Sequence, residues 1–162
     1  MSGSVQSTVP FHRPVRRHDV ITMSTIVPDY TTSGSATTER KVATRNLAEL
    51  LWMQYPGHFD RALSKAIVSP ETVGSRYFDY RISSYEPGAY VAAHMHKVQE
   101  QIYHVLSGDG MVIVDGERHL VRASDVTFVP PGVVHEVHCT GTNVLVFLVI
   151  TSPPTDEEPQ PQ

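Results

Sequence analysis

Turn residues divide the sequence between residues 61 and 150 into short segments at regular intervals. Within a segment, apolar and polar residues alternate: Phe78, Tyr80 and Ile82 share one face of an extended chain, and Asp79 and Arg81 share the other. Glu-Pro-Gly at 86–88, Ser-Gly-Asp-Gly at 107–110, Asp-Gly at 115–116 and Thr-Gly-Thr-Asn at 140–143 are typical turns. We therefore expect strands over 62–69, 73–85, 90–96, 101–106, 111–114, 119–121, 125–129, 135–139 and 144–150. This pattern predicts an all-β fold, an antiparallel sandwich or barrel.

The two ends of the chain differ from this middle region. Residues 1–44 are rich in Ser, Thr, Arg and Pro and predict a flexible N-terminal arm, and the Pro-rich, acidic residues 152–162 predict a disordered tail. Residues 45–151 then form the folded domain. A short helix is expected over 46–54, because Asn46 is a good N-cap and Leu47, Leu50 and Leu51 form an apolar stripe.

Length and composition exclude several classes of protein. The chain of 162 residues is long enough for one domain with a sizeable core. Its 13 basic and 17 acidic residues give a net charge of −4, so we expect no nucleic-acid surface. No apolar run reaches the roughly 18 residues of a membrane span, and no membrane partner is expected. Cys139 is the single cysteine, which excludes an internal disulfide and favours a cytoplasmic protein.

Three histidines carry the strongest chemical signal. His94 and His96 are two residues apart behind an extended run, so both imidazoles can face the same side and reach one metal ion. His135 follows a Pro-Pro-Gly turn some way along the chain. A lone His-x-His pair is weak evidence, but the turn residues around all three histidines strengthen the prediction of a metal site.

The spacing of these residues resembles the paired motifs of the cupin superfamily. The resemblance covers roughly residues 73–151 and rests on Gly88, His94, His96, Gln101 and Gly108 in the first motif and Pro130, Gly132, His135 and Cys139 in the second. It implies a double-stranded β-helix, a small jelly-roll barrel with one metal ion in its mouth. It also implies that His94, His96, Gln101 and His135 are the metal ligands.

Gln101 departs from the usual cupin pattern, which has Glu at this position. Glu100 lies one residue early and falls on the opposite face from Gln101 and Tyr103. The phrase from Glu100 to Gly108 is similar to a subset of cupins that use Gln as the fourth ligand. We interpret Gln101 as a ligand; the alternative is an amide that orients a histidine or a bound water. Ser124 and Cys139 also depart from the pattern, which has Gly and Asn there.

The resemblance and the donor types together predict the cofactor. Imidazole suits several divalent transition metals; Fe2+ is our first choice, with Zn2+, Mn2+ or Ni2+ as alternatives. Three imidazoles and an amide are neutral, so the bound ion would keep its full charge and act as a strong Lewis acid.

Other residues are assigned by their position along the strands. Tyr103 is two residues from Gln101 and is our candidate catalytic acid or base, although an aromatic core residue is an equal interpretation. Arg76 or Arg81 is a candidate for binding a substrate carboxylate, with a surface position the simpler alternative. By parity, His104 and His138 should face outward, and Cys139 is expected to be small and buried.

We expect a metal-dependent enzyme acting on a small carboxylate, enol or diketone-like metabolite, with a slight preference for an Fe(II) dioxygenase-type oxidoreductase. The alternatives are a non-redox Lewis-acid isomerase, lyase or cyclase, and a non-catalytic small-molecule-binding protein. The resemblance also implies a homodimer, and the 73–85 segment is the expected edge strand.

Overall fold

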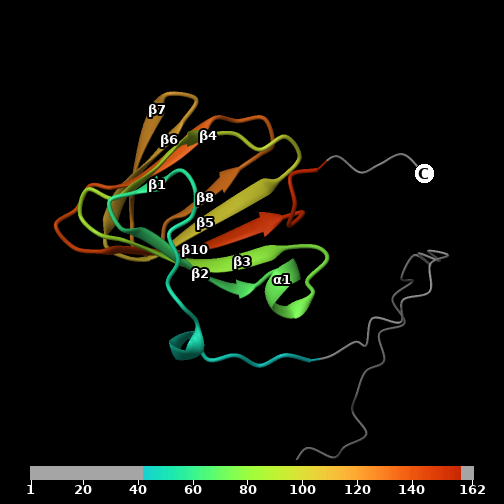
Figure 1. The fold of residues 1–162 in the computed structure, drawn as a ribbon. Coiled ribbons are helices and arrows are strands. Elements are labelled where there is room, and N and C mark those ends of the chain that lie inside the picture. Colours follow the sequence, from blue (N-terminus) through green and yellow to red (C-terminus); the bar gives the residue numbers. More distant parts are fainter. Residues whose placement is uncertain (1–41, 158–162) are drawn as a thin grey trace, which may run out of the picture. The chain divides into compact units, whose positions relative to one another are not determined.

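A computed structural model of the chain describes residues 42–157. These residues form two five-stranded antiparallel sheets, with strand orders β1-β4-β9-β6-β7 and β2-β3-β10-β5-β8 (Figure 1). The strands are β1 (His58–Phe59), β2 (Ala62–Val68), β3 (Asp79–Tyr85), β4 (Tyr90–His94), β5 (Glu100–Ser107), β6 (Asp109–Val114), β7 (Glu117–Arg122), β8 (Val126–Val129), β9 (His135–Cys139) and β10 (Leu145–Ser152). The predicted all-β double-stranded β-helix is confirmed.

The core lies between the two sheets and follows the predicted alternation. In β5, Gln101, Tyr103 and Val105 are buried, whereas His104 and Leu106 are exposed. The inner faces of other strands add further core residues, among them Tyr85, Val112, Val137, Leu145 and Phe147. The inward parity of β5 therefore places Gln101 and Tyr103 inside the barrel.

Glycine is required where the β5–β6 turn passes the chain before β10. Gly108 has a φ of +81°, and a Cβ atom there would lie 2.3 Å from the carbonyl oxygen of Val144. A side chain at this position would force the two segments apart, because the obstacle is backbone and cannot rotate away.

The expected strand over 73–85 is wrong in its first half. Residues Pro70–Val73 form the short helix α1, and β3 begins only at Asp79. Ser69 caps this helix in a capping box with Thr72, and Gly74 ends it with a φ of +72°. The missed signal is the sequence Ser-Pro-Glu-Thr-Val-Gly, which contains an N-cap, a proline at the first helical position and a C-terminal glycine.

The position of β3 also removes the reason given for the dimer. β3 pairs with β2 on one side and with β10 on the other, so it has no free edge. The outermost strands of the two sheets are β1, β7, β2 and β8. A dimer that extends a sheet would have to use one of these strands.

The lead-in before the barrel is more extended than predicted. Asn46 is an N-cap, but it caps only the 3-10 turn η1 (Leu47–Glu49). The chain then runs extended, and Met53 forms an isolated bridge with Ser64 of β2. The predicted arm falls mainly on residues 1–41, which lie outside the described residues, as do the last five residues of the predicted tail. Within residues 42–157, no helix has the length and apolar character needed to cross a membrane.

Candidate metal centre

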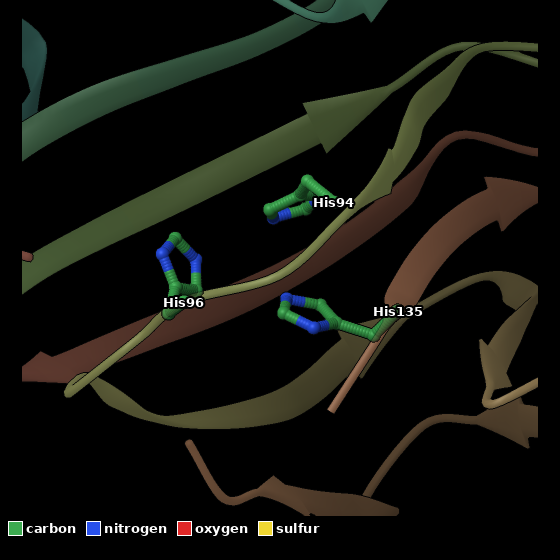
Figure 2. Close-up of side chains that lie close together, drawn as sticks. All are labelled: His94, His96 and His135. Carbon is green, nitrogen blue, oxygen red and sulfur yellow. The ribbon is translucent and has the colours of Figure 1, made fainter. Parts of the chain in front are cut away.

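Three histidines from separate parts of the sequence meet inside the barrel. His94 ends β4, His96 lies in the loop that follows it, and His135 begins β9. The β4–β9 pairing places His94 opposite His135, and β4 is interrupted before His94 by a register shift. One ring nitrogen of each of the three lies within 4.8 Å of the others, and Figure 2 shows the rings grouped around a shared space.

Two of the rings are held by backbone carbonyl groups. Nδ1 of His94 is 2.8 Å from the carbonyl oxygen of Ala92, and Nδ1 of His135 is 2.9 Å from that of Val133. A carbonyl oxygen can only accept, so each Nδ1 carries the proton. In the neutral ring this leaves a lone pair on Nε2, and a fixed tautomer of this kind is what metal-binding histidines have.

His96 has a buried ring nitrogen, Nε2, without a hydrogen-bond partner among the described residues. Its Nδ1 is 3.8 Å from a carboxylate oxygen of Asp156, and the same carboxylate accepts hydrogen bonds from the backbone N–H groups of Lys97 and Val98. Asp156 was expected in the disordered tail, but these contacts fasten residue 156 to the loop that carries His96. A buried nitrogen without a partner is costly, so this atom suits a bound ion.

The surroundings of His135 and His96 lower the pKa of both side chains. Burial lowers the pKa of His135 to about 4. The neighbouring rings of His94 and His96 act in the same direction, and the hydrogen bond to the Val133 carbonyl acts in the opposite direction. Burial and then His94 also lower the pKa of His96, with Asp156 acting in the opposite direction. Neutral imidazoles are the form that binds metal, so the lowered pKa values of these two residues favour metal binding at neutral pH.

Gln101 points its carbonyl oxygen at this cluster. Oε1 is 3.0 Å from Nε2 of His135, and Nε2 of Gln101 donates to the hydroxyl of Thr151 at 3.2 Å. When His135 has its proton on Nδ1, its Nε2 has a lone pair, and Oε1 of Gln101 has lone pairs as well, so neither atom can donate a hydrogen bond to the other. A cation beside them would satisfy both, so the residues present fit a divalent metal. Turning the amide would instead donate a proton to Nε2, which corresponds to an orienting role for Gln101.

Tyr103 lies behind Gln101. Its hydroxyl donates to Oε1 of Gln101 at 2.5 Å, and the residue is only 5% exposed. Burial raises the pKa of Tyr103 well above its ordinary value, so the hydroxyl keeps its proton. The structure therefore places Tyr103 where it fixes the Gln101 amide; its predicted catalytic role remains a prediction.

Two of the three histidines, His94 and His96, border a cavity of about 390 Å³, and the wall of this cavity contains a second group of polar residues. Arg81 and Asp79 of β3 line this cavity together with Tyr55 and His58. Arg76, the other candidate for a carboxylate contact, is exposed and does not line it. Arg81 lies within β3, whereas Arg76 lies in the bend between α1 and β3.

His58 is a cavity residue that the sequence analysis missed. Its Nδ1 is 3.1 Å from the Pro56 carbonyl oxygen, and its ring meets the rings of Tyr55 and Tyr85 edge-on. Burial lowers its pKa, and the nearby His94 and Arg81 act in the same direction against the Pro56 carbonyl. The neutral ring leaves Nε2 as an acceptor on the cavity wall. Its position directly after the Tyr-Pro-Gly turn gave no periodic signal.

The outward assignments agree with the structure. Glu100 and His104 are exposed. His138 faces away from the core, where it contacts Glu136 at 2.8 Å and stacks on Tyr90. Cys139 is buried and has no disulfide.

The fold and the site together define a small jelly-roll domain with a three-histidine cluster suited to a divalent metal. Residues 81–151 match the family model described as a cupin domain. This match and the jelly-roll fold identify residues 81–151 as similar to a cupin domain.

Known relatives support this assignment over part of the chain. An uncharacterized protein of Methanocaldococcus jannaschii is 31% identical over 71 residues, which is 44% of this chain and 57% of that protein. The oxalate-binding protein of Thermotoga maritima is 34% identical over 64 residues, covering 40% of this chain and 53% of that protein. The chain thus spans about half the length of the curated relatives it matches.

A solved structure shows the same fold over a longer stretch. The crystal structure of a predicted oxalate decarboxylase from Thermotoga maritima superposes with a TM-score of 0.62 at 23% identity. The match covers 68% of this chain and 98% of that protein. At this identity the likeness establishes the fold and not the activity.

Proposed function

We propose that this protein is a metal-dependent cupin enzyme acting on a small oxygen-rich acid, enol or diketone-like metabolite. The observation that carries the proposal is the convergence of His94, His96 and His135. His94, His96 and Gln101 line a cavity, and the carbonyl oxygen of Gln101 lies beside His135. When bound, a divalent metal would supply Lewis acidity and, in the case of Fe2+, redox chemistry.

The neutral donors favour an anionic substrate. None of the four side chains cancels the charge of the ion, so the centre would attract a chelating carboxylate or enolate more strongly than a site with a glutamate ligand. The relative named an oxalate-binding protein is in keeping with a small acid as the ligand.

The other cavity residues hold and orient such a substrate. Tyr103 fixes the Gln101 amide and keeps its own proton, and His58 offers an acceptor nitrogen on the cavity wall. Val91 and Val149 contribute apolar surface to the cavity, which limits the water around the bound acid. Tyr103 and His58 therefore supply orientation and proton contacts.

Our first choice within this class is an Fe(II)-dependent oxygenase, because a neutral site tolerates both an anionic substrate and dioxygen. A non-redox isomerase, lyase or cyclase is the second candidate, favoured by the same Gln101 that makes the ion a strong Lewis acid. A purely binding protein is the third. A cytoplasmic location fits the single, buried Cys139.

Two measurements test the proposal. Metal analysis of protein purified without a histidine tag should find about one transition-metal ion per chain. Oxygen uptake is then followed with Fe2+-loaded protein and a panel of hydroxy acids, enols and diketones. Oxygen consumption that requires Fe2+ supports the oxygenase; anaerobic turnover with Zn2+ or Ni2+ supports the second candidate. A protein that neither retains nor binds a divalent metal contradicts the whole proposal.

A further inference from the structure

The cavity wall contains an ion pair whose geometry leaves one side of an arginine available. Nε of Arg81 donates to Oδ1 of Asp79 at 2.6 Å, and Nη2 donates to Oδ2 at 2.8 Å. The side chain of Asp79 is 7% exposed and that of Arg81 is 28% exposed. The carboxylate therefore occupies the Nε edge of the guanidinium, while Nη1 and the second proton of Nη2 remain as donors.

The guanidinium is fixed in place before any ligand arrives. Cζ of Arg81 lies over the ring of Tyr55, 4.4 Å from the ring centroid, in a cation–π contact. The bidentate contact with Asp79 sets the plane of the group. A planar donor held on one edge and one face is pre-organised to bind a carboxylate on its remaining edge.

The alternative role for this pair is purely structural. In an ion pair that only stabilises the fold, the other N–H groups of the arginine normally donate to protein groups, because burying a polar group without a partner costs free energy. Here Asp79 is the only protein partner of the Arg81 nitrogens among the described hydrogen bonds, and both residues line the cavity that two of the histidines border. His58, on the same wall, is close enough for Arg81 and His94 each to lower its pKa.

We propose that Arg81 binds a second acidic group of the substrate, so that the site takes an acid with two anionic ends. One end would chelate the ion held by the histidines, and the distal carboxylate would bind the free edge of Arg81. This inference rests on the proposed function and adds to it a class of substrate: dicarboxylic acids with a chelating 2-hydroxy or similar group at one end.

Matched pairs of acids test the inference by isothermal titration calorimetry on the full chain loaded with Zn2+. Malate and 2-hydroxyglutarate each have a chelating 2-hydroxy acid end and a distal carboxylate. The controls 2-hydroxybutanoate and 2-hydroxypentanoate keep the chelating end and replace the distal carboxylate with a methyl group. We expect the better-fitting diacid to bind about tenfold more tightly than its control, since charge-assisted contacts exceed neutral ones.

Variants assign the gain to Arg81. The pair Asp79→Asn with Arg81→Gln removes both charges together, so no buried charge is left unpaired, and it should abolish the preference for the diacid. The control acids should bind this variant as they bind the wild type, which shows that the metal end is intact. Arg76→Gln, at an exposed position outside the cavity, should keep the full preference.

The outcomes separate this inference from the proposed function. If each diacid binds no more tightly than its control, the Arg81 assignment is overturned while the metal-dependent function stands. A preference that persists in the double variant also overturns it. If the Zn2+-loaded protein binds none of the four acids, the inference is overturned, whereas the proposed function fails only if the protein does not bind a divalent metal. The comparison of wild-type affinities does not depend on whether any variant folds.

Discussion

Gln101→Glu is the substitution that best tests how the metal centre is built. Oε1 of Gln101 lies 3.0 Å from Nε2 of His135 and accepts a hydrogen bond from Tyr103. Glutamate would keep this oxygen and exchange the amide nitrogen for a second oxygen, which the Thr151 hydroxyl can serve by donating in place of accepting. The change therefore adds one negative charge with little change in shape.

The expected effect is a balance of two large terms. A unit charge pair about 4 Å apart is worth about 4 kcal/mol at an effective dielectric constant of 20, so a carboxylate and a divalent ion attract by roughly twice that. The cost of removing the carboxylate from water offsets several kcal/mol of this attraction, because residue 101 is only 8% exposed. We expect a net gain of roughly 1.4 to 3 kcal/mol, which is about a 10- to 100-fold tighter metal complex. Turnover should fall, because the ion loses Lewis acidity.

Competition with a chromophoric chelator for Zn2+ measures the affinity, and turnover is measured on the same preparations. Gln101→Ala should bind metal more weakly than the wild type, and Glu100→Gln, on the exposed face of β5, serves as the matched control with no change. If Gln101→Ala and Gln101→Glu both keep the wild-type affinity, Gln101 is not a ligand. The neutral-site reasoning would then be wrong, and its amide would only orient His135.

Three further predictions concern the metal, acidity and assembly. His96→Ala should abolish metal retention, as measured by metal analysis, while leaving the far-ultraviolet circular dichroism unchanged; full metal content in this variant would contradict the site. The free energy of unfolding of the metal-free protein should fall by up to about 3 kcal/mol as the pH falls from 6.5 to about 4. The reason is that His135 takes up a proton in the unfolded chain over this pH range, whereas the buried imidazole of the folded protein stays neutral. Urea unfolding at pH 6.5 and at pH 4 measures this change in the free energy of unfolding. His135→Gln should make the change smaller; a variant whose unfolding free energy depends on pH as strongly as that of the wild type would contradict the prediction. The protein should be a homodimer of twice the 18.0 kDa chain mass by light scattering, formed through an outermost strand such as β7, where Leu120 is 81% exposed; a monomer at micromolar concentration would count against this.

The local sequence determined the strands and the inward face of the metal-binding segment. Alternation in β5 placed Gln101, Tyr103 and Val105 inside and His104 outside, because side chains on a strand point to opposite faces in turn. The turn residues fixed where most strands begin and end. The helix α1 was missed because a capping signal of a few residues was outweighed by the aromatic alternation that follows it.

The tertiary structure alone decided what surrounds the histidines. Strand pairing encloses β3 between β2 and β10 and puts Arg81 in the cavity, whereas Arg76 lies in the bend before β3 and does not line the cavity. His58 and Asp156 reach the site from chain segments that have no periodic signal of their own. Their positions depend on the closure of two sheets around one core, which brings together residues distant in sequence. Sequence spacing reports only which neighbours along one strand share a face, so it could indicate the histidines but not the opposite wall of their cavity.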